Sequence, residues 1–176
     1  SGIPLYELDM LGFSIGYELG ITGVLTMLER GRIPLLKKDR TEDDPIIIAG
    51  GCGITNPVPL QNFFDAFFIG EAEHEMFYLI EKIALMKMAG AKRNELLKIF
   101  TSHESVWIPG KKAKRAVYYE FGKEKDMGSY FPIANIKPVQ EHGVVEIMRG
   151  CPNGCRFCHA GIYYRPHRMK PIDIII

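Results

Sequence analysis

Short apolar runs alternate with helix-like segments in the first half of the chain. Three of these runs, residues 11–15, 46–49 and 66–70, have the length and composition of buried strands. Residues 17–30 and 71–89 place apolar side chains at the three- and four-residue spacing of a helix face, and a glycine follows each segment. Apolar strands that alternate with helices are typical of parallel βαβ units. The pattern therefore predicts an α/β fold with a small doubly wound parallel sheet.

The pattern changes after residue 91. Residues 94–101 have helical spacing, and residues 105–110 and 113–122 predict two short strands joined by a basic turn. The stretch from 122 to 142 is rich in glycine, proline and charge, which favours a linker. An apolar run at 144–148 then predicts a strand that leads directly into a group of cysteines. We therefore expect three regions: an α/β domain at 1–91, a helix, hairpin and linker at 92–142, and a strand with a cysteine loop at 143–176.

Composition and charge narrow the class of protein. A net charge of +1 gives no support for general attraction to nucleic acid or to an anionic membrane. No apolar run approaches the ~20 residues of a membrane span, so we expect no membrane partner. Three of the four cysteines are clustered, which favours ligands over disulfides and a reducing, cytoplasmic location. Because the sequence starts without Met and stops in the apolar run "PIDIII", we also expect a fragment of a longer protein.

The cysteine group is the strongest chemical signal. Cys151, Cys155 and Cys158 follow the predicted strand at Cys-x3-Cys-x2-Cys spacing, and Gly150 and Gly154 permit a tightly wound backbone. A 4Fe–4S cluster is normally held by four thiolates, so three would leave one iron with an open position. Zinc is the main alternative for these thiols. A non-catalytic Cys3His zinc or electron-transfer module would take its fourth ligand from one of three histidines: His142, His159 or His167.

The string "RGCPNGCRFC" resembles the cluster-binding loop of the radical S-adenosylmethionine (SAM) enzymes, including Phe157 before the last cysteine. The resemblance implies that Cys151, Cys155 and Cys158 ligate a 4Fe–4S cluster whose fourth iron is chelated by SAM. It implies an enzyme that cleaves SAM reductively to a 5′-deoxyadenosyl radical, with an electron donor such as flavodoxin or ferredoxin. It also implies that the strand at 144–148 begins a (β/α) barrel, truncated here before the parts that hold the methionyl and adenosyl groups. The substrate is not implied.

Two longer strings, "LDMLGFSIGYELGITGVLTML" and "IIIAGGCGITNPVPLQNFFDAFFIGEAE", are similar to the N-terminal, cobalamin-binding-like domain of some bacterial members of that family. Ligands of parallel sheets bind beyond the carboxyl ends of the strands, so the loops at 14–16, 50–55 and 70–73 are expected to form a crevice. No Asp-x-His-x-x-Gly loop is present, so cobalamin with a histidine ligand on cobalt is not expected, and histidine-independent binding stays open.

Two weaker signals, a fourth cysteine and a group of acidic residues, each have a structural explanation that we favour. Cys52 follows a predicted strand and is expected to be a half-buried thiol outside the cluster. Three acidic residues suit acid–base chemistry, but also the positive end of a helix dipole, which we favour; they are Glu71, Glu73 and Glu75.

The basic residues also allow two interpretations. The turn from Lys111 to Arg115 lies near Trp107, Tyr118 and Tyr119 and could bind RNA, but a solvated hairpin tip is favoured. Three arginines flank the cysteines, and tuning a cluster or binding an anion is weighed evenly against a plain surface role; they are Arg149, Arg165 and Arg168.

Overall fold

The computed structural model describes residues 2–123, 137 and 143–175. The chain forms two compact units, Ser1–Tyr118 (unit 1) and Tyr119–Ile176 (unit 2). Within the described residues, no helix is both long and apolar enough to cross a membrane. Most of the linker expected at 122–142 lies outside the described residues.

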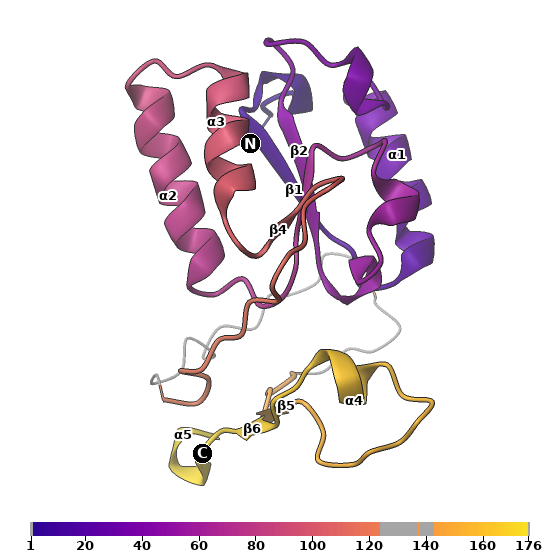
Figure 1. Cartoon of the computed structure of the whole chain (residues 1–176), viewed down its shortest axis with the longest axis vertical. Helices are drawn as coiled ribbons and strands as arrows, with labels where there is room; N and C mark the ends of the chain where they lie inside the picture. Colours follow the sequence, from indigo (N-terminus) through magenta and orange to yellow (C-terminus); the bar gives the residue numbers. More distant parts are fainter. Residues whose placement is uncertain (1, 124–136, 138–142, 176) are drawn as a thin grey trace. The chain divides into compact units, whose positions relative to one another are not determined.

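Unit 1 contains a four-stranded sheet with the order β1-β2-β3-β4 (Figure 1). The first three strands run parallel, from β1 (Met10–Ser14) through β2 (Ile46–Gly50) to β3 (Ala66–Phe68). The last strand, β4 (Val106–Trp107), is antiparallel to β3. The predicted α/β class with a mainly parallel sheet is therefore confirmed.

Helices cover both faces of this sheet. Helix α1 (Ile21–Arg30) lies on one face, and α2 (Glu75–Met88) and α3 (Arg93–Ser102) lie on the other (Figure 1). The described part of the same unit also has five short 3-10 helices, the first before β1 and the others in the connections: η1 (Leu5–Glu7), η2 (Glu18–Gly20), η3 (Lys37–Asp39), η4 (Cys52–Ile54) and η5 (Val58–Leu60).

The central strand β2 is apolar throughout because both of its faces are buried. Ile47 and Ala49 pack on the α1 side, in a core with Leu28 and Phe64. Ile46 and Ile48 point to the opposite face, where the core contains side chains of α2 and α3, namely Leu79, Ile83, Leu96 and Phe100. The alternation of a strand thus delivers one apolar run to two cores.

The hairpin predicted over residues 105–122 is wrong. Val106 and Trp107 pair with β3 instead of with the residues after the basic turn. Within the second predicted strand, Ala116 makes an isolated parallel bridge to Gly70. Each segment therefore pairs with an element far away in the sequence, which local alternation cannot reveal.

Unit 2 contains a two-stranded antiparallel pair, β5 (Met148–Arg149) and β6 (Arg168–Met169). Two single-turn helices accompany it, α4 (Ala160–Tyr163) and α5 (Ile172–Ile175). The strand expected at 144–148 is present only at its last residue, since residues 143–147 have no strand structure and are exposed. In the described part of this unit the Phe121 ring is buried, with the Arg149 guanidinium 4.6 Å from its centroid.

Candidate functional site

The three clustered cysteines lie on the connection between β5 and α4. All three are free thiols; Cys155 is exposed, and Cys151 and Cys158 are half-buried. The connection starts at Gly150, whose φ of 78° lies in the left-handed region. A Cβ there would be 2.6 Å from the Tyr164 carbonyl oxygen, so the backbone passes Tyr164 at a distance that only glycine allows. The sequence thus positions Cys151 directly after a fixed turn.

The donor set fits an iron–sulfur site by its chemistry: three unpaired thiols within eight residues. The positions of these thiols, however, do not form a metal site. Among the described residues, no group of three or more His, Cys, Asp or Glu side chains is close enough to hold a metal ion. Holding a cluster would therefore require this loop to change its conformation. Phe157, which the motif predicts to lie at the cofactor, is 93% exposed, so its ring contributes little to packing of the loop.

The three histidines considered for a zinc site differ in their surroundings. The ring of His159 stacks on Tyr163, with centroids 5.6 Å apart. His167 has a buried Nε2 with no hydrogen-bond partner in the described part of the chain. His142 lies outside the described residues. A Cys3His group is thus not assembled among the residues that the structure describes.

A small cavity of about 240 Å³ adjoins the start of the cysteine loop, lined in part by Glu146, Arg149 and Cys151. Arg149 donates from Nε and Nη2 to the two carboxylate oxygens of Glu146, both at 2.9 Å. Arg165 Nε donates to the Gly161 carbonyl, and Arg168 Nε donates to the Pro166 carbonyl. The arginines beside the cysteines therefore brace the local backbone and one carboxylate.

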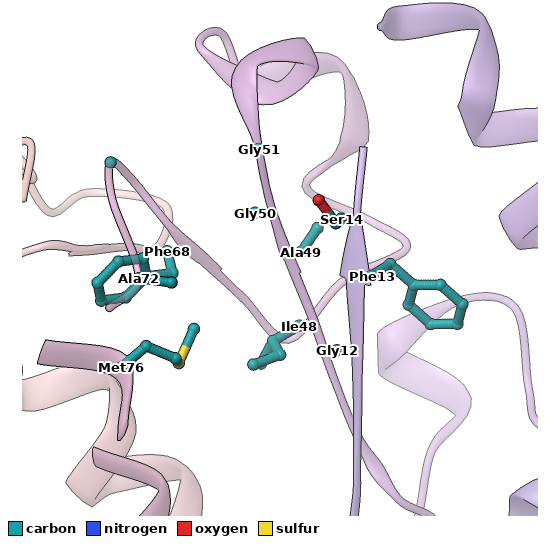
Figure 2. A pocket seen from close by; sticks show the side chains of 11 residues that line it. Gly12, Phe13, Ser14, Ile48, Ala49, Gly50, Gly51, Phe68, Ala72 and Met76 are labelled. Carbon is teal, nitrogen blue, oxygen red and sulfur yellow. The ribbon is translucent and has the colours of Figure 1, made fainter. Parts of the chain in front are cut away.

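A second cavity, of about 210 Å³, lies in unit 1 at the carboxyl ends of β1 and β2 (Figure 2). Residues from each of the three loops expected to meet there line it, among them Ser14, Gly50, Gly51, Gly70 and Ala72. Figure 2 shows the Met76 side chain approaching from α2, whereas Phe13 points away on the other side of β1. The expected crevice is therefore present as a small cavity.

Glycines shape this cavity by close backbone approaches. Gly51 has a φ of 99°, and a Cβ there would be 2.5 Å from the Ile15 carbonyl oxygen. Gly70 has a φ of 118°, and its Cβ would be 2.3 Å from the Ala116 carbonyl oxygen. The described lining carries one hydroxyl, that of Ser14, and no charged side chain. Its volume is below the ~300–1,000 Å³ of typical drug-sized ligand sites.

Cys52 lies in unit 1 at the start of η4 and is half-buried, as predicted. Its Sγ donates a hydrogen bond to the Gly16 carbonyl oxygen at 3.0 Å. The thiol therefore links two of the loops at the carboxyl edge of the sheet.

The acidic residues before α2 are used in structural contacts. The interpretation that all three occupy the first turns of a helix is wrong for Glu71 and Glu73, because α2 begins at Glu75. Glu71 lies 3.5 Å from the Arg115 guanidinium and accepts a hydrogen bond from the Tyr118 amide. These contacts hold the residue outside the helix.

Glu75 does open the helix, and it bonds to His103 Nε2 at 2.9 Å. His103 Nδ1 accepts from the Ser105 amide, so Nε2 carries the proton and donates to Glu75. This hydrogen bond is the main reason that the pKa of Glu75 lies below its usual 4.5. The pair fastens α2 to the end of α3.

The basic turn binds mainly to its own chain. Lys111 donates from Nζ to the carbonyls of Thr101 and His103, and burial lowers the pKa of this ammonium group. Lys114 pairs with Glu104 at 3.3 Å. Together with the Arg115–Glu71 contact, these bonds occupy cations that the RNA hypothesis needs at the surface.

Sequence reasoning missed a buried ionic cluster at the amino ends of the parallel strands, opposite the cavity at their carboxyl ends. Asp65 Oδ2 accepts from Arg40 Nη1 at 3.2 Å, from Arg93 Nη2 at 2.8 Å and from the Ile47 amide at 2.7 Å. The side chains of Arg40, Asp65 and Arg93 are 0%, 4% and 9% exposed. A charged residue inside the apolar string "FFDAFF" was the available signal, because a buried carboxylate needs partners.

Comparison with known proteins gives a family match for the first part of the chain. The family described as "Radical SAM proteins, N-terminal" matches residues 1–109, which is more than half of the 176 residues. The chain therefore belongs to the radical SAM family. The match covers the sheet of unit 1 and stops before the cysteine loop.

The chain is also similar to an uncharacterized protein of Methanocaldococcus jannaschii. The two are 30% identical over 139 residues, which is 77% of this chain and 28% of the relative. The chain thus spans less than a third of that relative's length. No solved structure matches the chain.

Proposed function

We propose that this chain is part of a radical SAM enzyme in which Cys151, Cys155 and Cys158 ligate a 4Fe–4S cluster. The observation that supports the proposal most is the presence of three free thiols on one loop in a chain of the radical SAM family. In such enzymes the cluster supplies an electron that splits bound SAM into methionine and a 5′-deoxyadenosyl radical. An electron donor such as flavodoxin or ferredoxin is the corresponding partner.

The residues of the chain itself have defined tasks in this proposal. Each of the three cysteines would hold iron as a deprotonated thiolate. Gly150 turns the backbone out of β5, so that Cys151 starts the loop at a fixed point. Because ligand convergence and local folding are coupled, binding would draw the exposed Cys155 towards the other two thiols. Arg149, held by Glu146, keeps a cationic side chain next to Cys151.

Two finer assignments belong to the same proposal. The sheet of unit 1 would correspond to the cobalamin-binding-like domain, and its carboxyl-edge cavity to the position of a ligand site. The β5 strand and the cysteine loop would correspond to the start of a (β/α) barrel completed by other parts of a longer protein. Substrate choice would then depend on residues of that barrel.

The test is anaerobic reconstitution of the 176-residue chain with ferrous iron and sulfide, followed by measurement of iron and acid-labile sulfide. We expect close to four iron atoms per chain. Replacing Cys151, Cys155 or Cys158 with Ser should remove most of this iron, since serine does not supply the thiolate. Addition of SAM should change the electron spin resonance spectrum of the reduced protein, because the amino acid part of SAM would bind the open iron.

Cys52→Ser is the matched control, because this thiol bonds to Gly16 in unit 1 and a serine hydroxyl can keep that bond. Its iron content should equal that of the unchanged protein. Equal iron loss in Cys52→Ser and Cys155→Ser would contradict the ligand assignment. Stoichiometric zinc with no bound iron and sulfide would instead favour the non-catalytic zinc module.

A further inference from the structure

Unit 1 has a cationic groove at the amino ends of the parallel strands. The cavity has a volume of about 770 Å³ and lies along α3 and η3. Arg93 fixes the position of this site, because it opens α3 and donates to the Asp44 and Pro45 carbonyls just before β2. In the described lining, Asp65 is the single carboxylate among five cations: Lys37, Lys38, Arg40, Arg93 and Lys98.

The floor of the groove carries an excess of positive charge. Arg40 and Arg93 share one oxygen of Asp65, so the three buried side chains have a net charge of +1. Burial lowers the pKa of Arg40 and the neighbouring Arg93 lowers it further, while Asp65 and Asp44 oppose the shift. A buried cationic excess is costly in a low-dielectric environment. An anion in the groove would reduce that cost.

Several donors in the groove are not used by the described chain. Arg40 is the exception, because it donates to Asp65 and to the carbonyls of Pro34, Leu35 and Phe63. Arg93 uses Nε and Nη2, and no acceptor for its Nη1 is found among the described residues. Within the same residues, the ammonium groups of the three lining lysines make no ion pair or hydrogen bond; they are Lys37, Lys38 and Lys98.

The N-terminus of α3 is not the recognition element, because its own chain already covers it. Glu95 accepts from the Lys92 amide, and Glu42 accepts from the amide and side chain of Asn94. A ligand would therefore be held by lysine and arginine side chains. Several separate cations fit several linked anionic groups better than one carboxylate.

We propose that this groove binds a small organic polyphosphate, with its phosphates on the lysines and Arg93. The uncharged part of the lining combines two polar residues, Asn94 and Thr101, with an apolar patch that would take the carbon-rich part of the molecule. This apolar patch consists of Leu97, Ile108 and Pro109. The volume lies within the ~300–1,000 Å³ typical of small-molecule sites. This site belongs to unit 1 and does not depend on the cysteine loop of the proposed function.

The test is isothermal titration of the 176-residue chain with ADP, inorganic pyrophosphate, inorganic phosphate and adenosine, at low salt and without added metal. We expect ADP to bind most tightly, pyrophosphate next, and adenosine not at all. Combined replacement of Lys38 and Lys98 with Ala should weaken ADP binding by about tenfold or more, since two charge-assisted contacts are lost. Circular dichroism and thermal melting should be unchanged, because both lysines are exposed.

The matched control replaces two exposed lysines that do not line the groove, Lys82 on α2 and Lys112 after β4. It should keep the ADP affinity of the unchanged chain. An equal loss in both double variants would overturn the proposal, as would undetectable ADP binding at millimolar concentration. Binding of a short single-stranded RNA that excess pyrophosphate does not displace would overturn it in favour of a nucleic-acid surface.

Discussion

Asp65 holds together the residues at the amino ends of the parallel strands. One of its oxygens accepts from two guanidinium groups and from the Ile47 amide of β2. In Asp65→Asn the carboxylate charge disappears while both arginines remain buried. We expect the free energy of unfolding to fall by about 3–5 kcal/mol, as when one partner of a buried ion pair is removed. Urea unfolding followed by fluorescence of Trp107, the single tryptophan, measures the change in unit 1.

Lys114→Ala provides the comparison for this measurement. Its ion pair with Glu104 is exposed on both sides, and exposed pairs contribute about 0–1 kcal/mol. If Asp65→Asn cost no more than Lys114→Ala, the two buried guanidinium groups would not depend on Asp65 for compensation.

The sequence predicts groups of residues that lie close together along the chain, but not groups whose members are far apart in sequence. The spacing of the three cysteines is contained in eight residues, so the donor set could be predicted without a structure. Asp65 stands out within its apolar string, but its partners Arg40 and Arg93 lie 25 and 28 residues away. No local pattern connects these three positions, because the fold alone brings them together.

At the scale of elements, burial explains which predictions were right. Strands β1, β2 and β3 and helices α1, α2 and α3 were all predicted, because each buries a continuous run or one face. The helix expected from residue 71 starts at Glu75, since Glu71 is bound to Arg115 and to the Tyr118 amide instead. Strand β4 lies within the strand predicted at residues 105–110, but the local pattern did not reveal that its partner is β3.

Gly70 joins two such distant elements. It follows β3 with a φ of 118° and bridges Ala116. In Gly70→Ala the new Cβ would meet the Ala116 carbonyl oxygen at 2.3 Å and its amide nitrogen at 2.5 Å. We expect a loss of about 3 kcal/mol or more in the free energy of unfolding, from backbone strain and from the overlap together. Urea unfolding with Trp107 fluorescence measures the loss.

Gly90→Ala separates these two contributions. Gly90 ends the α2 turn with a φ of 92°, but nothing lies within 4 Å of its added Cβ. Only the conformational strain remains there, which corresponds to about 1–2 kcal/mol. A loss in Gly70→Ala no larger than that in Gly90→Ala would show that the backbone approach at Ala116 relaxes easily.

At the scale of the whole molecule, the family match and the cysteine loop lie in different units. The radical SAM family matches residues 1–109, which includes the whole sheet of unit 1. The cysteine loop lies outside that match and is interpreted from its donor set. The motif predicts three cysteine ligands, and that ligand role stays a prediction. Among the described residues the three thiols are not grouped as a metal site, and ligand convergence is coupled to metal binding.

Catalytic turnover is therefore expected to require more than the residues described here. A (β/α) barrel consists of parallel strands whose side chains fill a closed core. The described part of unit 2 offers two strands of two residues each, paired antiparallel, and a cysteine loop with an exposed Phe157 and Cys155. Such a loop has few side chains that could orient SAM or exclude water from a radical.

We expect the reconstituted, reduced 176-residue chain to form less than one 5′-deoxyadenosine per cluster from added SAM, measured by liquid chromatography over several hours. Cys155→Ser, treated identically, gives the background from reductant alone. Iron content is measured in the same samples, so that a chain without a cluster is distinguished from a chain whose cluster does not turn over. Sustained formation of many equivalents above that background would show that this small unit suffices for the chemistry, and the need for a surrounding barrel would be refuted.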